Sequence, residues 1–277
     1  FEESPAGTAG AVKLLEDRLE DTFIVASGDV LADVDMRSLV ERHRHDGAVA
    51  TMALTTVDRP EEFGIVGLDE DGRIIRFKEK PRTEEVFSNL INAGIYVLER
   101  EVLPEIPMGE MYDFSKQLFP RLLAAGRPLF GAPLNGLWKD IGRPRDLLDA
   151  NIQMAERKGQ HIEAEGARCR GNIVADYFSA SDSCIDGPVY IGKGAILGRS
   201  ALLSSCAVGK EVEVDASSII EDSFIMDRCS IGKGCVVRGS LLGKDCSIDD
   251  NVTLLNCILG DGVRVSGPAM VEDQMLE

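Results

Sequence analysis

The chain has 277 residues, 44% of them hydrophobic and 28% charged, which are the proportions of a globular protein large enough for two domains. Its formal net charge of −17 argues against nucleic acid or an anionic membrane surface as a partner, because both require clustered lysine and arginine. No apolar run approaches the ~18 residues of a membrane-spanning helix, and the first residues lack the pattern of a signal peptide, so we expect no membrane partner.

The first half of the chain alternates predicted helices and strands. Strands are expected at 22–27, 48–56, 64–68, 73–78 and 91–99, and helices at 9–19, 35–45, 113–126 and 144–158. The first strand is expected to be buried, and the turn at 69–72 is expected to join the third and fourth strands into a hairpin. Gly47 is placed to end the second helix, Asp113 to cap the third and Pro144 to begin the fourth. This alternation predicts an α/β layer with a mainly parallel sheet, in which ligands bind at the carboxyl ends of the strands.

Two carboxylates are predicted at such strand ends. Asp29 follows the TFIVA strand, beside Gly28, which allows a ligand to approach the backbone. Asp140 lies in the WKDIG segment just before a helix. Two carboxylates from separate segments suit Mg²⁺, which typically binds one or two protein carboxylates and completes its coordination with phosphate oxygens and water.

A lysine and an amide are predicted at two further strand ends. Lys80 ends the strand of the FKEKP segment just before a proline, where its charge could contact a phosphate. Asn92 opens the next strand in the NAG segment, with an amide that can hydrogen-bond sugar hydroxyls.

The second half of the chain repeats with a period of 17 residues from Ile191 onward. Three positions of the repeat are aliphatic in every copy, at steps of six, six and five, and the fifth position is always small. Such a pattern predicts a three-sided coil with inward aliphatic ladders, which is stable only when coils stack. The three aliphatic columns are Ile191, Val208, Ile225, Leu242 and Leu259; Leu197, Val214, Ile231, Ile248 and Val265; and Leu203, Ile220, Val237, Leu254 and Val271.

All seven cysteines lie in this second half, and none forms a C-x-x-C pair. Cys229 and Cys246 occupy the small column, so they are predicted to be neighbours inside the coil. We therefore expect reduced thiols that serve as small apolar core residues, and a cytoplasmic location. An earlier, imperfect coil is expected near Ile173.

In chain order, the segments PAGTAGA, SGD, EFGIV, FKEKP, NAGIYVLE, YDF and WKDIGRP, followed by the repeats, resemble the sugar-1-phosphate nucleotidyltransferase family. The resemblance covers almost the whole chain. The GTAGA, NAGIYVLE and YDF segments are most similar to mannose-1-phosphate guanylyltransferases. The family implies a Rossmann-like α/β catalytic domain, expected at residues 1–160, and a left-handed parallel β-helix of hexapeptide repeats at 165–277. The hand of the coil comes from the resemblance and not from the spacing.

The reaction that the resemblance implies joins a nucleoside triphosphate and a sugar 1-phosphate into a nucleotide sugar and pyrophosphate. The residues carried over by motif are Gly7, Thr8 and Gly28 for the nucleotide; Gly64, Glu79, Lys80 and Asn92 for the sugar phosphate; Asp29 and Asp140 for Mg²⁺; and Lys80, Asp29 and Asp140 as the catalytic set. No general base is required, because a phosphate oxygen is already a competent nucleophile. The site must align that oxygen and neutralise negative charge.

Three alternatives stay open. Glucose-1-phosphate thymidylyl- and uridylyltransferases share most of these segments, with dTTP or UTP in place of GTP. A hexapeptide acetyltransferase typically needs a histidine base in its coils, whereas His43, His45 and His161 lie outside the repeats, and the first two are expected to be solvated. A non-catalytic regulatory homologue is opposed by the retained Asp29, Lys80 and Asp140.

Two departures from the family pattern affect these expectations. These enzymes usually begin with a glycine-rich, arginine-containing phosphate loop, and no segment of the chain matches it. We therefore expect an N-terminally incomplete catalytic domain that is weakly active or inactive by itself, with GTAGA as its second nucleotide loop. Arg143 stands where relatives commonly have a threonine able to cap the next helix.

The flat faces of the coils are expected to make homo-oligomer contacts.

Overall fold

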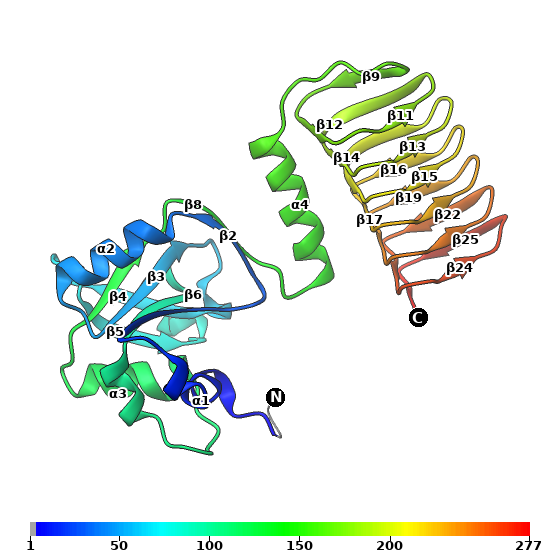
Figure 1. The fold of residues 1–277 in the computed structure, drawn as a ribbon. Helices are drawn as coiled ribbons and strands as arrows, with labels where there is room; N and C mark the ends of the chain where they lie inside the picture. Colours follow the sequence, from blue (N-terminus) through cyan, green and yellow to red (C-terminus); the bar gives the residue numbers. More distant parts are fainter. Residues whose placement is uncertain (1–3) are drawn as a thin grey trace. The chain divides into compact units, whose positions relative to one another are not determined.

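The computed structural model describes residues 4–277, which divide after Asp140 into two compact units (Figure 1). The sequence places the division near residue 160 instead. Helix α4 (Pro144–Lys158) accounts for the difference, because it contacts strands β12 and β14 of the second unit and is part of that unit. Within residues 4–277, no helix combines the length and the hydropathy needed to cross a bilayer.

The first unit contains a six-stranded sheet in the order β5-β4-β6-β3-β7, with β1 also paired to β6, and a separate β2-β8 ribbon. The long central strand β6 holds the sheet together, since it pairs with three other strands. The strands are β1 (Thr22–Ala26), β2 (Val30–Val34), β3 (Ala50–Thr56), β4 (Gly64–Leu68), β5 (Ile74–Glu79), β6 (Leu90–Glu99), β7 (Leu129–Pro133) and β8 (Gly136–Asp140).

The expectation of a mainly parallel sheet is wrong for the strands described. Only β3 and β7 pair in parallel, and the other pairs of this sheet are antiparallel. Alternation of helices and strands does not determine strand direction here, because the β4–β5 hairpin and the chain reversal into β6 produce antiparallel neighbours. Strand β1 is also not fully buried, since the side chain of Ile24 is 46% exposed.

The second predicted helix follows the sequence signals closely, whereas the first, expected at 9–19, is only seven residues long and is followed by a 3₁₀ turn at Glu16–Arg18. Helix α2 (Met36–Asp46) begins at Asp35, whose carboxylate accepts a hydrogen bond from the backbone N–H of Arg37, and ends at Gly47 in the left-handed conformation. Helix α1 spans Gly7–Lys13. The third predicted helix starts as a π-helical turn at Phe114–Leu118 and continues as α3 (Phe119–Ala124).

His43, expected to be solvated, is instead buried with 1% of its surface exposed. Its Nδ1 lies 2.8 Å from Thr51 Oγ1 and its Nε2 lies 3.0 Å from Glu99 Oε1. The helix period places His43 toward the sheet, where two polar partners satisfy both ring nitrogens.

The second unit is the predicted coil of stacked repeats. Each aliphatic column forms an in-register parallel ladder, for example Leu197–Val214–Ile231–Ile248–Val265. Nearly all members of the three ladders are fully buried, so the period of 17 residues is confirmed as the repeat of a β-helix. The earlier coil near Ile173 is confirmed as well, because β9 (Ala167–Arg170) and β10 (Ile173–Ala175) both pair with β12 (Ser183–Ile191).

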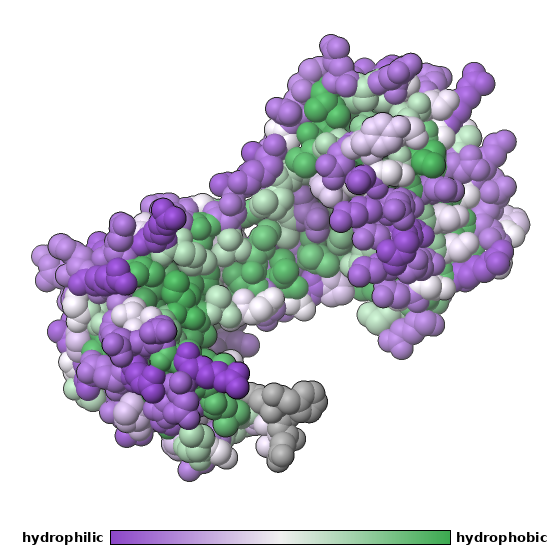
Figure 2. All heavy atoms as spheres, viewed as in Figure 1, coloured by the Kyte–Doolittle hydropathy of each residue, from purple (hydrophilic) through white to green (hydrophobic). Residues whose placement is uncertain are grey.

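The remaining coil strands are short, and polar residues occupy the corners between them. Several corner residues have positive φ, such as Ser217, Arg228 and Asn256. In Figure 2 the visible face of the coils is largely hydrophilic. The strands are β11 (Ser179–Ala180), β13 (Ile196–Leu197), β14 (Leu202–Val208), β15 (Glu213–Val214), β16 (Ile219–Glu221), β17 (Phe224–Ile225), β18 (Ser230–Ile231), β19 (Val236–Arg238), β20 (Leu241–Leu242), β21 (Ser247–Ile248), β22 (Val252–Leu255), β23 (Ile258–Leu259), β24 (Arg264–Val265), β25 (Ala269–Glu272) and β26 (Met275–Leu276).

The cysteines are free thiols, and five of the seven are buried. Cys229 and Cys246 lie next to each other in the core, as the small column predicts. Burial raises the pKa of the Cys229 thiol to about 12. The Cys229 thiol therefore stays protonated, and the buried cysteines serve as small core residues.

Candidate active site

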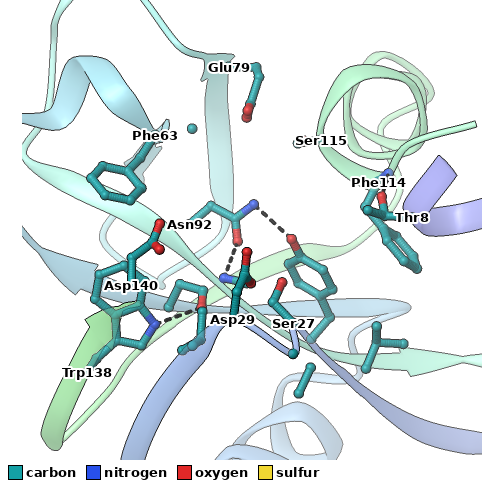
Figure 3. Close-up of a pocket in the computed structure, with 18 of the residues that line it drawn as sticks. Thr8, Ser27, Asp29, Phe63, Glu79, Asn92, Phe114, Ser115, Trp138 and Asp140 are labelled. Atoms are coloured by element: carbon teal, nitrogen blue, oxygen red, sulfur yellow. Dashed lines mark hydrogen bonds between the residues drawn. The ribbon is translucent and has the colours of Figure 1, made fainter. Parts of the chain in front are cut away.

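A cleft of about 740 Å³ lies within the first unit (Figure 3). Residues from β1, the β1–β2 turn, β4, β5, β6, β8 and the π-helical turn line it. Of the nine residues that the sequence assigns to binding or catalysis, all except Gly7 line this one cleft. They are Thr8, Gly28, Asp29, Gly64, Glu79, Lys80, Asn92 and Asp140.

The two candidate metal ligands meet because β2 pairs with β8. Val30 lies directly opposite Asp140 in this antiparallel ribbon, so Asp29, the residue before Val30, is next to Asp140 although 111 positions separate them in sequence. Asp29 is exposed, and among residues 4–277 its carboxylate has no hydrogen bond or ion pair. Asp140 is half-buried. A carboxylate without a partner, beside a second carboxylate on the cleft wall, fits a divalent cation.

The amide of Asn92 is held in one orientation by two hydrogen bonds. Its Oδ1 accepts from the N–H of Gly94 at 3.0 Å, and its Nδ2 donates to the hydroxyl of Tyr96 at 2.9 Å (Figure 3). Burial raises the pKa of Tyr96 to about 12, so this phenol stays protonated. One N–H and one lone pair of the Asn92 amide remain for a ligand.

A bulge in β6 directs Asn92 into the cleft. Between the pairs Met52–Tyr96 and Leu54–Asn92, β3 advances two residues and β6 four. Gly94 sits in this bulge with a φ of 70°, and a Cβ there would lie 2.8 Å from Ser27 Oγ. The indole N–H of Trp138 donates to the carbonyl of Ala93 at 2.8 Å and so supports the bulge.

Glu79 and Gly64 lie opposite each other in the β4–β5 hairpin. A Cβ on Gly64 would lie 2.6 Å from Glu79 Oε2 and 2.9 Å from the ring of Phe77, so only glycine leaves space for this carboxylate. Burial raises the pKa of Glu79, and this effect exceeds the opposing effects of Lys80, a hydrogen bond with Ser115, and Lys116. The carboxylate is therefore a desolvated hydrogen-bond acceptor.

Lys80 is held at the end of β5 by its backbone. Its φ is 40°, which is unusual for a residue other than glycine. Its N–H donates to the carbonyl of Phe63 at 3.0 Å, and Pro81 after it is buried. The side chain is exposed on the cleft wall, where its charge is available to an anion.

Thr8 is attached to the segment before the π-helical turn. Its N–H donates to Asp113 Oδ1 at 3.0 Å, and its hydroxyl accepts from the N–H of Phe114 at 3.1 Å. The prediction that Asp113 caps the helix is wrong, because its carboxylate bonds to Thr8 instead of the helix N–H groups. Gly7 lies against the backbone of Tyr112, just outside the cleft lining.

Several cleft residues were not singled out in the sequence. Phe63 and Trp138 form an edge-to-face ring pair with centroids 5.8 Å apart. The hydroxyl of Tyr96 accepts a hydrogen bond from the Asn92 amide, and Ser115 lines the cleft together with Glu79. Phe63, Trp138 and Tyr96 lie inside the EFGIV, WKDIGRP and NAGIYVLE segments, so an aromatic residue within a recognised motif was the available signal. Ser115 carried no such signal.

Two family models match the chain. A model described as nucleotidyl transferase matches residues 1–157, and a model described as the EIF2B subunit epsilon LbH domain matches residues 173–272. The chain belongs to the nucleotidyl transferase family. The match to an LbH domain model agrees with the left-handed parallel β-helix that the sequence resemblance implies for residues 165–277.

Curated relatives of the chain include enzymes of two specificities. A UTP–glucose-1-phosphate uridylyltransferase from Synechocystis is 35% identical over 78% of the chain and 60% of the relative. Mannose-1-phosphate guanylyltransferase 1 from Arabidopsis thaliana is 32% identical over 91% of the chain and 72% of the relative. A mannose-1-phosphate guanylyltransferase from Mycobacterium tuberculosis is 33% identical over 79% of the chain and 61% of the relative.

Proposed function

We propose that the protein transfers a nucleotidyl group from a nucleoside triphosphate to a sugar 1-phosphate. A phosphate oxygen of the sugar phosphate attacks the α-phosphorus, a new P–O bond forms, and the bond to the leaving pyrophosphate breaks. The observation that carries the proposal is that Thr8, Asp29, Lys80, Glu79, Asn92 and Asp140 all line one cleft. Relatives named for this type of reaction support it.

The residues of the cleft divide between the two substrates. Glu79 and Asn92 would bind sugar hydroxyls, since one offers a desolvated acceptor and the other a fixed amide. The backbone of Gly64 would contact the sugar, and Lys80 would bind its phosphate and neutralise charge during the transfer. Thr8 would lie along the nucleotide, with Gly28 and Gly7 beside it.

Asp29 and Asp140 would hold Mg²⁺. The ion, when bound, would offset the negative charge on the triphosphate. The two carboxylates would hold it at the β2–β8 wall of the cleft.

A homo-oligomer through the β-helix and a cytoplasmic location also stay predictions.

Pyrophosphate release tests the reaction. The protein would be assayed with GTP, UTP and dTTP, each against mannose 1-phosphate and glucose 1-phosphate. The GTAGA loop favours GTP with mannose 1-phosphate, and UTP or dTTP with glucose 1-phosphate is the alternative. Release that requires both substrates supports the proposal, whereas no release with any pair contradicts it.

Binding of the sugar phosphate is expected to weaken as the pH falls. Since the pKa of Glu79 is raised above 4.5, protonation removes its charge and turns one acceptor oxygen into a donor at a pH where ordinary glutamates are still ionised. Lys80, Lys116 and Asp113 are the charged groups that act on it. We expect the wild type to lose affinity for the sugar phosphate between pH 7 and pH 5.

The matched comparison is Glu79→Gln, measured by calorimetry over the same pH range, so that titration of the substrate cancels. The wild type should bind more tightly at pH 7, and its advantage should shrink toward pH 5. A ratio of affinities that does not change with pH would contradict the role of Glu79.

Gly64→Ala is expected to raise the KM for the sugar phosphate by about tenfold, because the new methyl group displaces the Glu79 carboxylate. Gly67→Ala in the same strand is the control, since its Cβ would meet neighbours at 3.3 Å, a mild contact outside the cleft. Steady-state kinetics would measure both variants. Equal KM values for Gly64→Ala and the wild type would show that space for the Glu79 carboxylate beside Gly64 is not needed for binding the sugar phosphate.

A further inference from the structure

The segment Asp113–Lys116 contacts the candidate nucleotide side of the cleft through Thr8. Asp113 Oδ1 accepts from the N–H of Thr8 at 3.0 Å and lies 3.4 Å from its hydroxyl, which itself accepts from the N–H of Phe114. These contacts join residues about 105 positions apart in sequence. The backbone hydrogen bond from Thr8 lowers the pKa of Asp113, so the carboxylate is charged at neutral pH and is the stronger kind of acceptor.

The same segment contacts the candidate sugar side of the cleft two residues later. Ser115 and Glu79 both line the cleft, and the hydroxyl of Ser115 and the charge of Lys116 both act to lower the pKa of the Glu79 carboxyl. Lys116 also forms an ion pair with Asp113 at 3.1 Å. Figure 3 shows Ser115 and Phe114 on the element that faces both Glu79 and Thr8.

The segment is held rigidly. The N–H groups of Gln117 and Leu118 both donate to the carbonyl of Asp113 at 3.2 Å, which forms the π-helical turn, and Gln117 Oε1 accepts from the N–H of Asp113 at 2.7 Å. The ring of Phe114 packs against Tyr96 and Phe119, with centroids 5.1 and 5.7 Å away. Turns of this kind are rare, and they occur frequently at functional sites.

We propose that Asp113 and Ser115 are positioning residues that set the two halves of the cleft from one turn of the chain. Asp113 orients Thr8 for the nucleotide, and Ser115 orients Glu79 for the sugar. Neither touches the reacting atoms. This inference depends on the function proposed above, and it adds that a single rigid segment aligns both substrates.

Crossed variants test the proposal, and each serves as the control for the other. Asp113→Ala should raise the KM for the nucleotide about tenfold, since it removes hydrogen bonds to a charged acceptor, and leave the KM for the sugar phosphate within about twofold. Ser115→Ala should raise the KM for the sugar phosphate several-fold and leave the KM for the nucleotide unchanged. Asp113→Asn keeps an acceptor oxygen for Thr8, so it should restore most of the nucleotide affinity.

A merely structural role would give a different pattern. If both alanine variants raise both KM values equally, or if neither changes a KM, the proposal is overturned. If thermal melting shows that Asp113→Ala does not fold, the other two variants still test the proposal. Asp113→Asn must keep the affinity for the nucleotide, and Ser115→Ala must weaken only the binding of the sugar phosphate.

The failure of the inference can be told apart from the failure of the proposed function. If the wild type releases pyrophosphate but each variant changes the KM values for both substrates alike, only the positioning roles are wrong. If the wild type binds both substrates by calorimetry without releasing pyrophosphate, the function is wrong, and the crossed pattern is read from the dissociation constants. If it binds neither substrate, both proposals are overturned.

Discussion

Asp29→Asn and Asp140→Asn are each expected to lower kcat/KM by about 10²–10³-fold, the usual effect of losing one pre-organised charged group at a site of charge development. Asn is nearly isosteric with Asp, so the β2–β8 ribbon that carries Asp140 should be retained. The loss should come from weaker metal binding and a misaligned triphosphate.

The measurement is pyrophosphate release as a function of MgCl₂ concentration, with melting temperature as the folding check. Both variants should need more Mg²⁺ for half-maximal rate, because each lacks one anionic ligand. Asp71→Asn, in the exposed turn between β4 and β5, is the matched control and should behave like the wild type. Unchanged turnover in both cleft variants would end the assignment of a metal to this wall.

Ile231→Ala is expected to destabilise the β-helix by about 3 kcal/mol, within the usual cost of truncating a buried isoleucine. Ile231 is 1% exposed and lies between Val214 and Ile248 in the middle of its ladder. The cavity cannot collapse easily, because the coils above and below hold the register of the strands.

Ile196→Ala is the matched control, on the same sheet but with its side chain 47% exposed. It should cost no more than about 1 kcal/mol, the span of strand propensities. Urea unfolding, followed by circular dichroism, would give both free energies of unfolding. Similar losses in the two variants would contradict the inward ladder assigned to Ile231.

The coil could be predicted residue by residue because its information is periodic. Each aliphatic column, such as Leu203–Ile220–Val237, pairs with the copy 17 residues away, so the spacing alone gives the register. The same reasoning predicted the Cys229–Cys246 contact. Helix α2 and the β4–β5 hairpin were equally accessible, since their caps and turn residues are local signals.

The sheet of the first unit could be predicted only in part. Strands β1, β3, β4, β5 and β6 were located, whereas β2, β7 and β8 were missed. The strand directions were also not predicted, because pairing with β6 depends on residues far away in sequence. The cleft residues that were predicted were identified from sequence motifs and not from the predicted sheet. The exposure of His43 was misjudged for a related reason, since only the packed sheet shows which side of α2 is buried.

The sequence by itself determined the β-helix and eight of the residues that line the cleft, since one rests on a short period and the other on ordered motifs. Only the tertiary structure decided that Asp29 and Asp140 are neighbours across a β-ribbon, and that Asp113 bonds to Thr8 instead of capping its own helix. The physical reason is distance along the chain. A repeat or a helix cap depends on residues one coil or one turn away, whereas the partner of an isolated polar side chain depends on which distant segment packs beside it.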